Sequence, residues 1–378
     1  MKAVDQDVAV PFRGPPILSL TGARFFACLF VVLYHTEYVW LDQMTLIDGP
    51  IRNIMKSGFS GVGFFFILSG FVLGYRYGGD TADFPHHRYF VARFARIYPA
   101  LFFSLLVAAP VALAAGLAPD GDLTLGGLAP VESVLITFLG NVAVLSAWFP
   151  KIGYWNYPAW SLTCEVFFYA LFPASCALVW KGGRRVAWVS CAGLVVACAL
   201  IQNSAGSIPI ENVFFFPPFR FLQFGMGVVL ARVFLLSERE SSSALAIVPL
   251  LVLLVAFALS DHFSRDYLRT GWIDIASLLT IYFLAQRESF LTRLLSHPLL
   301  LLLGESSYAL YLLHVPLRDT TRALVNRVDA LQQLPQALIF VTFLFLSVLA
   351  SVLTFKYLEA PARRRINAWE RAREASRT

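Results

Sequence analysis

Charged residues are scarce in this sequence of 378 residues. Asp, Glu, Lys and Arg make up 14% of the chain and the mean hydropathy is +0.66, whereas a soluble globular protein carries about 25% charged residues. The scarcity of charge excludes a soluble globular protein, and the 34 Phe and 8 Trp residues exclude a disordered chain, a collagen and a coiled coil. A polytopic helical membrane protein remains, because the composition suits a series of apolar spans of about 20 residues each.

The cysteines lack the spacing of a metal site or a disulfide framework. The five are Cys28, Cys164, Cys176, Cys191 and Cys198. All lie in apolar stretches and no two form a CxxC pair, so we interpret them as small buried thiols. We therefore expect neither a metal nor a bound cofactor. The net charge of +6 does not require a nucleic acid partner, because in a membrane protein it reports basic cytoplasmic loops.

A cleavable signal peptide and an internal repeat are also absent from the pattern. The first apolar run contains Arg24 and His35, and charged residues of this kind do not occur in the apolar region of a signal peptide. The absence of a repeat weakens the hypothesis of a transporter built from inverted repeats.

Apolar runs separated by breakers predict an all-α polytopic integral membrane protein of about ten transmembrane helices, in one domain over residues 1–378. The expected spans are 17–40, 58–77, 97–116, 159–180, 186–202, 214–236, 244–260, 271–286, 298–317 and 335–357. An eleventh apolar run, 131–149, is doubtful as a span because it starts at Glu132 and contains Asn141.

Loop charge decides how the eleventh run is interpreted. If 131–149 does not cross, the loops on the side of the N-terminus hold 20 Lys and Arg residues and the loops on the other side hold 8. The positive-inside rule then places both termini, including the basic tail 358–378, in the cytoplasm. We therefore expect 131–149 to be a re-entrant or interfacial segment on the outer side, packed against protein or water.

Two ionisable residues lie inside the first span. Arg24 and His35 are eleven residues apart, which is about 1100° of helical rotation, so they share one face and lie about 16 Å apart along the axis. Ala27, Cys28 and Val31 fill the line between them. Small residues in such a stripe are explained by helix packing, but an ionisable residue within a span is a functional hypothesis by default.

A carboxylate opens the fourth span. Glu165 follows Trp160 and Ser161, and the span boundaries predict that it lies at the depth of His35. A carboxylate beside a histidine orients the ring and raises its basicity, so the two residues form a candidate acid/base pair. The alternative is a buried ion pair that only fixes helix packing.

Two further clusters of polar residues lie at span ends. Arg93 and Arg96 enter the membrane together at the cytoplasmic end of the third span, and arginine is suited to bidentate contacts with phosphate. Ordinary positive-inside anchoring is the alternative. Near the outer end of the ninth span, Tyr308, Tyr311 and His314 form a slanted stripe, for which an interfacial aromatic belt is the alternative.

Seven segments of the chain, in order, resemble the signatures of one family. They are Leu20–Arg24 with Val31–His35, Gly63–Phe71, Arg93–Pro99, Trp160–Glu165, Arg220–Gly225, Ser307–His314 and Tyr357–Pro361. Together they resemble the membrane-bound acyltransferase family 3, bacterial integral-membrane enzymes that O-acylate cell-surface and secreted sugars and some antibiotics. The chain departs from the family at Leu20, where an acidic residue is usual.

The resemblance implies an acyl-CoA-dependent O-acyltransferase in the bacterial cytoplasmic membrane. It implies transfer of an acyl group, commonly acetyl, from cytosolic acyl-CoA to a hydroxyl, with His35 as general base oriented by Glu165 and with the pantetheine arm along the small-residue face of the first span. The acyl-CoA site would comprise Arg24, Arg93, Arg96, Ser69 and Tyr98. The acceptor or outer site would comprise Trp160, Ser161, Tyr308, Tyr311, His314 and Arg220. A covalent acyl-enzyme on His35, Cys28 or Cys164 stays open.

The identity of the acceptor also stays open. The first expectation is a cell-surface or exported polysaccharide, or its lipid-linked precursor. The alternative is a small molecule such as a macrolide antibiotic, and a more remote alternative is a proton-coupled transporter that uses the buried ionisable residues as a relay. Acceptor choice should lie in the outer loops 41–57, 117–158 and 318–334. The lipid bilayer is an expected partner, and a homo-oligomer is left open.

Overall fold

The computed structural model describes residues 15–37, 39–40, 49–79, 84–117, 125, 128–204, 213–237, 242–260, 271–286 and 288–376. Over these residues the protein is built from helices joined by turns, without a β-strand. The all-α fold expected from the composition is confirmed.

Eight helical segments within the described ranges are long and apolar enough to cross a membrane. They are built on α1 (Leu18–Glu37), α3 (Ser60–Tyr77), α4 (His86–Gly116), α6 (Trp160–Trp180), α7 (Arg184–Asn203), α8 (Pro217–Leu235), α12 (Pro298–Arg327) and α14 (Gln336–Thr354). The other two expected spans, 244–260 and 271–286, are helical but form only the 12-residue α9 (Ile247–Ala258) and the 13-residue α10 (Trp272–Leu284). Both are shorter than the roughly 20 residues that a span needs.

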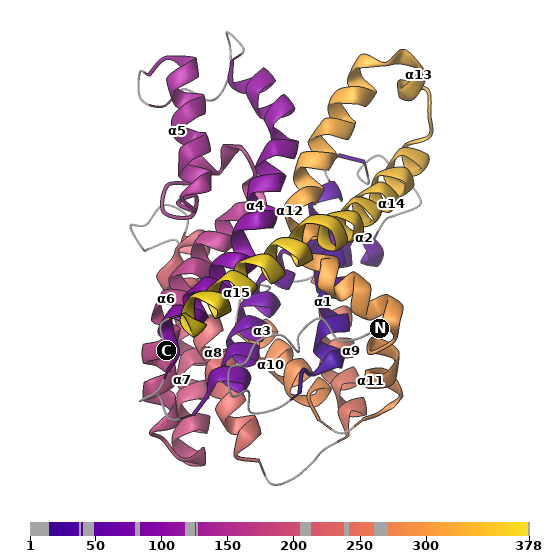
Figure 1. The fold of residues 1–378 in the computed structure, drawn as a ribbon. Helices are drawn as coiled ribbons and strands as arrows, with labels where there is room; N and C mark the ends of the chain where they lie inside the picture. Colours follow the sequence, from indigo (N-terminus) through magenta and orange to yellow (C-terminus); the bar gives the residue numbers. More distant parts are fainter. Residues whose placement is uncertain are drawn as a thin grey trace.

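Helices also extend beyond the apolar runs. The helix α4 begins eleven residues before its expected span and α12 ends ten residues after its own, because the apolar run marks only the part that lipid would surround. The helix α14 continues through a π-helical turn, Phe355–Glu359, into α15 (Ala360–Ala375). Figure 1 shows α4 and α12 next to each other at the centre and diverging towards the top, while α15 crosses the front of the molecule. The short helices are α2 (Pro50–Lys56), α11 (Phe290–Leu295) and α13 (Asp329–Gln332).

The doubtful run 131–149 forms a short helix followed by irregular chain. The helix α5 (Pro130–Val142) has 13 residues, about 20 Å of rise, which is less than the roughly 30 Å of a bilayer core. The chain then turns at Val144, which has a φ of 57°. The backbone N–H of Ala147 donates to the Thr163 hydroxyl of α6 at 3.3 Å. The segment is thus packed against protein, as expected for backbone that lipid cannot satisfy.

Glycines allow two pairs of helices to touch along their backbones. A Cβ added at Gly70 of α3 would lie 2.0 Å from the Phe224 carbonyl oxygen of α8, and one added at Gly304 of α12 would lie 1.9 Å from the Thr21 carbonyl oxygen of α1. Close approach of this kind is the usual role of small residues between membrane helices. The contact at Gly304 brings the start of α1 against the first part of α12, and residues from both helices line the cavity described below.

A proline and an asparagine join three elements at the centre of the molecule. Pro316 in α12 has no N–H and therefore leaves the Leu312 carbonyl without its helical donor. The fully buried Asn156 supplies that donor at 2.9 Å and also donates to the Ser104 hydroxyl of α4 at 3.0 Å. The chain entering α6 is thereby fixed to both α4 and α12.

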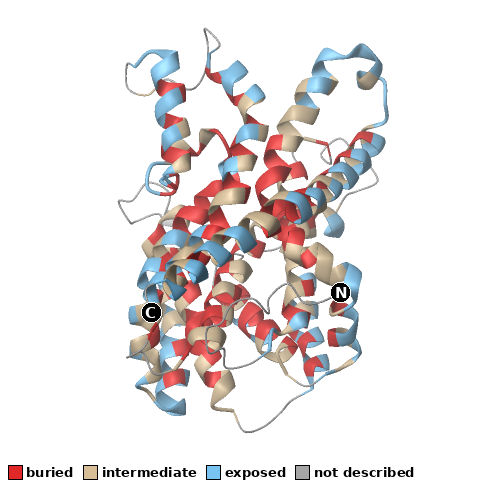
Figure 2. Cartoon of the chain, viewed as in Figure 1, coloured by how far each residue is buried: buried red, intermediate tan, exposed pale blue. Residues whose placement is uncertain are grey.

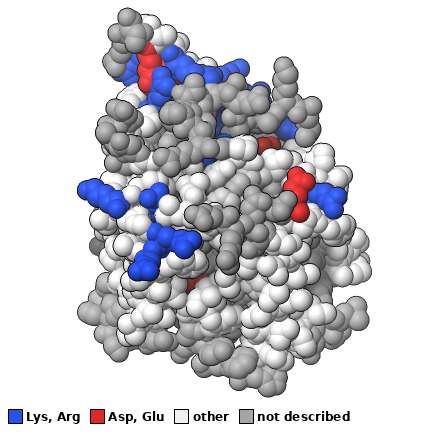
Figure 3. All heavy atoms as spheres, turned by 90° about the horizontal axis from the view of Figure 1, so that it is seen from below, with Lys and Arg blue, Asp and Glu red and all other residues white. Residues whose placement is uncertain are grey.

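The outer surface of the molecule is largely apolar. Leu178, Val189 and Phe345 are 74%, 73% and 65% exposed. Buried residues gather where the helices cross, with exposed residues on the outer sides and at the ends of α5 and α13 (Figure 2). The lower part of the face in Figure 3 is mostly free of charged side chains, and the basic ones lie along the upper edge and in smaller groups on the left and right. An apolar surface of this extent is typical of contact with lipid.

Candidate active site

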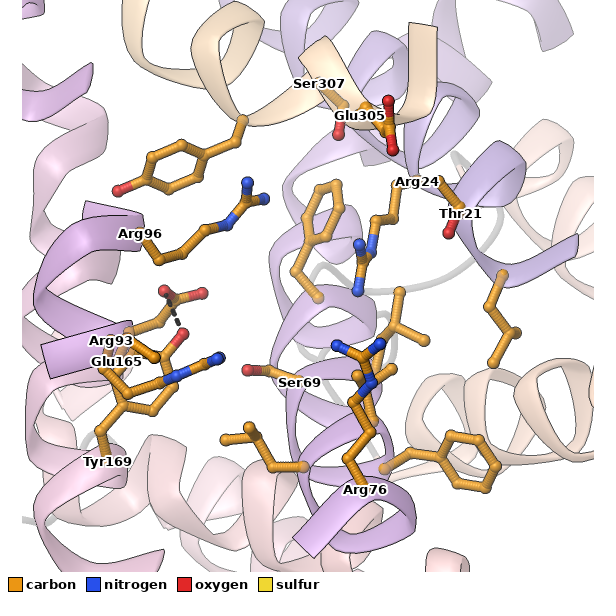
Figure 4. A pocket seen from close by; sticks show the side chains of 18 of the residues that line it. Thr21, Arg24, Ser69, Arg76, Arg93, Arg96, Glu165, Tyr169, Glu305 and Ser307 are labelled. Carbon is orange, nitrogen blue, oxygen red and sulfur yellow. Dashed lines mark hydrogen bonds between the residues drawn. The ribbon is translucent and has the colours of Figure 1, made fainter. Parts of the chain in front are cut away.

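A cavity of about 240 Å³ lies where α1, α3, α4, α6, α12 and α15 meet. Its wall carries seven arginines, namely Arg24, Arg76, Arg93, Arg96, Arg363, Arg364 and Arg371. Figure 4 shows the side chains of the first four extending into one space from α1, α3 and α4. Basic side chains from four helices therefore converge on a single cavity, which suits a ligand with several negative charges.

Four of the five residues expected to bind the acyl-CoA line this cavity. They are Arg24, Ser69, Arg93 and Arg96. The fifth, Tyr98, does not line it, and its ring stacks on that of Phe94 with the centroids 4.3 Å apart. The reason is helical geometry, because Tyr98 is two residues from Arg96 and so points about 200° away from it.

Two carboxylates are held near the arginines. The Arg96 guanidinium contacts the fully buried Glu359 carboxylate at 2.5 Å and lies over the Tyr308 ring at 4.6 Å from the centroid. Glu165 lines the cavity and accepts a hydrogen bond of 3.0 Å from the Tyr169 hydroxyl, as the dashed line in Figure 4 marks. The Glu359 carboxylate balances the charge of Arg96, but the arginines of the cavity wall still outnumber the carboxylates near them.

The placement of Glu165 corrects the expected pairing with His35. Glu165 lies in the same cavity as Arg24, and Arg24 is about 16 Å along α1 from His35. The chain before α6 forms a 3-10 turn, Tyr157–Ala159, and the Tyr157 ring lies 6.3 Å from the His35 ring, so Glu165 is eight residues further along the chain than the level of His35. The expectation of matched depth was therefore wrong, and Glu165 does not orient the His35 ring.

His35 has a different partner, His314 of α12. The His314 Nε2 and His35 Nδ1 atoms are 3.1 Å apart, and His35 Nδ1 is also 3.1 Å from the Val31 carbonyl oxygen. The His314 Nδ1 atom lies 2.7 Å from the Tyr311 carbonyl oxygen. His314 is fully buried and His35 is half-buried.

These contacts assign the protons of the pair. A carbonyl oxygen can only accept, so Nδ1 of His314 carries the proton and its Nε2 is an acceptor. Both contacts of His35 Nδ1 are then with acceptors, so this nitrogen also carries its proton. The remaining nitrogen of His35, Nε2, keeps its lone pair, which is the state required of a general base.

An arginine holds the end of α1 beside this pair. Arg318 of α12 donates to the His35 carbonyl oxygen at 2.8 Å and contacts Asp319 at 2.7 Å. The last carbonyls of a helix have no partner within the helix, so Arg318 satisfies one of them. This bond and the Nε2–Nδ1 contact fix α1 to α12 at two points around His35.

The residues expected at the outer site separate into three groups. Ser161, Tyr308 and Tyr311 line the arginine-rich cavity. His314 bonds His35, and its ring is 5.9 Å from the Tyr311 ring. Tyr311 therefore stands between the cavity and the histidine pair, since His35 and His314 do not themselves line the cavity.

Trp160 and Arg220 form the third group, which is part of the packed interior. The Arg220 guanidinium lies over the Phe214 ring at 3.7 Å and the Trp160 ring at 5.8 Å from the centroids. It also donates to Gln223, which in turn donates to the buried Asp274 of α10 at 2.7 Å. Neither Trp160 nor Arg220 lines the arginine-rich cavity, and their place at the acceptor site stays a prediction.

The small-residue stripe of α1 serves packing. Cys28 and Val31 are fully buried, and the Cys28 thiol donates to the Ser307 carbonyl oxygen at 3.2 Å. The cavity runs instead beside residues 62–77 of α3, so the expected course of the pantetheine arm along the stripe was wrong. Cys28 and Cys164 are both enclosed and outside the cavity wall, which gives an acyl-cysteine no direct route to a donor there.

Several lining residues were not among the candidates. They are Arg76, Tyr169, Glu305, Arg363, Arg364, Asn367 and Arg371. The positions 363, 367 and 371 recur every four residues, which is a helical signal. Of the loops expected to choose the acceptor, residues 41–48 and 118–124 lie outside the described residues, and 318–327 is the end of α12.

The fold and the cavity define an integral-membrane protein with a basic ligand site, and comparison with known proteins gives its family. A family model described as "Acyltransferase domain" matches residues 17–356. The chain therefore belongs to the acyltransferase 3 family, and it is an acyltransferase, as the resemblance implied. The transporter alternative is not supported.

Individual relatives are more distant. The chain is 28% identical to acyltransferase MdmB of Streptomyces mycarofaciens over 81% of this chain and 80% of the relative. It is 26% identical to the putative peptidoglycan O-acetyltransferase YrhL of Bacillus subtilis over 79% of this chain. It is 23% identical to a putative O-acetyltransferase of Staphylococcus aureus over 92% of this chain. The chain spans about half the length of these last two relatives, 48% and 57%. No solved structure matches.

Proposed function

We propose that the protein transfers an acyl group, commonly acetyl, from acyl-CoA to a hydroxyl of a cell-surface or exported polysaccharide or of its lipid-linked precursor. The observation that carries the proposal is the arrangement of an arginine-lined cavity and a histidine with a free lone pair on the two sides of Tyr311. The acetyltransferase names of two relatives support the acetyl group.

The donor would enter from the arginine-rich end. Arg24, Arg93 and Arg96 would hold its phosphates, and Ser69, which lines the cavity, would lie beside its pantetheine arm. The same end carries the basic helix α15, so the positive-inside rule supports a cytosolic location for it, in the bacterial cytoplasmic membrane. Tyr311 lines the cavity and neighbours His314, which contacts His35. The thioester would therefore meet the acceptor beside Tyr311.

The chemistry would be a direct transfer. The acceptor oxygen attacks the thioester carbonyl carbon while its proton passes to Nε2 of His35. The carbon–sulfur bond breaks, and the departing thiolate takes the proton from the His35 imidazolium. His314 would hold the His35 ring in the required tautomer and stabilise the imidazolium through its Nε2 lone pair, the role that a carboxylate plays in other triads.

Substitution of the two histidines tests this function. We expect His35→Ala to abolish transfer of labelled acetyl from acetyl-CoA while leaving CoA binding, measured by calorimetry, near that of the wild type. We expect His314→Ala to lower kcat about tenfold or more and His314→Gln, which can still accept from His35 Nδ1, to restore part of it. The exposed His86 offers a matched control, and His86→Ala should act like the wild type.

Different results of these experiments would exclude different parts of the proposed function. Turnover by His35→Ala above a few per cent of the wild type would exclude the general-base role. Equal rates for His314→Ala and the wild type over the whole pH range would exclude the positioning role. A macrolide acylated in place of a polysaccharide acceptor would keep the chemistry and change the substrate to the small-molecule alternative.

A further inference from the structure

The helix α15 contributes to the cavity although it lies beyond the residues that the family model matches, 17–356. Four of its residues line the cavity wall, and three of these are arginines. They are Arg363, Arg364, Asn367 and Arg371. At 100° per residue these four positions fall within about 100° of one another around the helix, so one face of α15 is turned towards the opening.

Contacts between side chains fix α15 in this position. Its Glu370 contacts His87 at 2.5 Å, and Glu374 contacts Arg88, both on the first turn of α4. Before α15, Glu359 contacts Arg96 at 2.5 Å. All three carboxylates therefore contact side chains of α4. Figure 1 shows α15 lying across the front of the bundle. The acidic residues of this segment therefore anchor it, while its arginines remain at the mouth of the cavity.

The polarity of the cavity wall changes along its length. Ser161 and Tyr311 are 5% and 6% exposed and form the buried end, where the wall carries hydroxyl groups. Arg24 and Arg96 are half-buried. Arg364 and Arg371 are exposed and form the mouth. A ligand that matches this order has an uncharged, extended end inside and its greatest negative charge outside.

We propose that α15 forms the outer part of the binding subsite for the phosphates at the nucleotide end of the acyl-CoA donor, beyond the part formed by Arg24, Arg93 and Arg96. This proposal rests on the proposed function, because it requires that acyl-CoA is the donor. Coenzyme A carries a diphosphate and a 3′-phosphate at one end and its thiol at the other, which is the order of charge in the cavity. Arginine side chains bind phosphate in a bidentate manner, and exposed pairs are weakened by solvent, so several are needed at such a mouth.

The phosphate of an anionic lipid has the same chemistry, and the experiment must distinguish the two sources. The test variant is the double substitution Arg364→Gln and Arg371→Gln. The matched control is Arg365→Gln, on the same helix but outside the cavity wall. Calorimetry with CoA and with 3′-dephospho-CoA would be run in detergent without lipid and in nanodiscs with and without phosphatidylglycerol. Steady-state rates would be measured with acetyl-CoA and with acetyl-pantetheine, which lacks the nucleotide.

We expect the double variant to bind CoA about tenfold more weakly in every medium, with the control unchanged. Its selectivity for acetyl-CoA over acetyl-pantetheine should fall by a similar factor, and a measurable rate with acetyl-pantetheine would show that the variant is folded. Wild-type affinity for CoA in the double variant would overturn the proposal, as would a loss seen only when phosphatidylglycerol is present. A wild-type protein that turns over neither donor would instead refute the proposed function, and this subsite with it.

Discussion

The contact between α1 and α12 at Gly304 can be tested with the addition of one methyl group. In Gly304→Ala the new Cβ would lie 1.9 Å from the Thr21 carbonyl oxygen, which is about 1.1 Å closer than real contacts allow. The obstructing atoms belong to the backbone, so no side chain can rotate away. The two helices must therefore separate by about 1 Å, and overpacking of this kind costs about 1–3 kcal/mol.

Separation of α1 and α12 would also displace residues that line the cavity. Thr21 and Arg24 line it from α1, and Glu305 and Ser307 line it from α12. A displacement of about 1 Å between groups that position a substrate can lower the rate about 100-fold. We expect Gly304→Ala to lower both the midpoint of thermal unfolding in detergent and kcat/KM for acyl-CoA.

A glycine elsewhere in the molecule provides the control. Gly193 lies in the exposed face of α7, and a Cβ added there meets no atom within 4 Å. Alanine is favoured over glycine in a helix interior by about 0.8–1.0 kcal/mol, so Gly193→Ala should be neutral or stabilising and fully active. If Gly304→Ala unfolds and turns over like Gly193→Ala, then α1 and α12 do not touch at this glycine and the reasoning fails.

Two further outcomes are expected. Glu165→Gln should change KM for acyl-CoA more than kcat, because Glu165 shares its cavity with the arginines and does not contact His35; a large loss of kcat with unchanged KM would revive the acid/base pair. Single cysteines at Lys181 and Tyr157, on the two sides of α6, should be labelled by an impermeant thiol reagent from opposite faces of the membrane. Labelling of position 181 from outside the cell would contradict the expected orientation.

The sequence predicts those parts of the site that lie on a single helix. The eleven-residue spacing of Arg24 and His35 and the three-residue spacing of Arg93 and Arg96 are fixed by helical geometry, and the structure keeps both. Contacts between helices depend on relative depth, which hydropathy locates only to within a few residues. Glu165 was therefore assigned to His35, although it lies with the arginines.

The role of α15 was hidden for another reason. A basic segment after the last apolar run is the usual positive-inside signal, so its arginines carry no separate mark of ligand binding. Which face of α15 is turned towards the cavity depends on the rotation of the chain between α14 and α15. The sequence of the segment alone does not give that rotation. The pairing of His35 with His314 was similarly hidden, because 279 residues separate them.

The π-helical turn at Phe355–Glu359 sets the rotational phase of the tail. A π turn holds one residue more than the α-helical turn it replaces, and one residue corresponds to about 100° of rotation. Without that residue, α15 would leave the membrane turned by about a quarter of a circle, and the arginine face would miss the mouth of the cavity. A single insertion in the chain's last long helix therefore determines which side of the tail meets the ligand, independently of the amino acids that the tail contains.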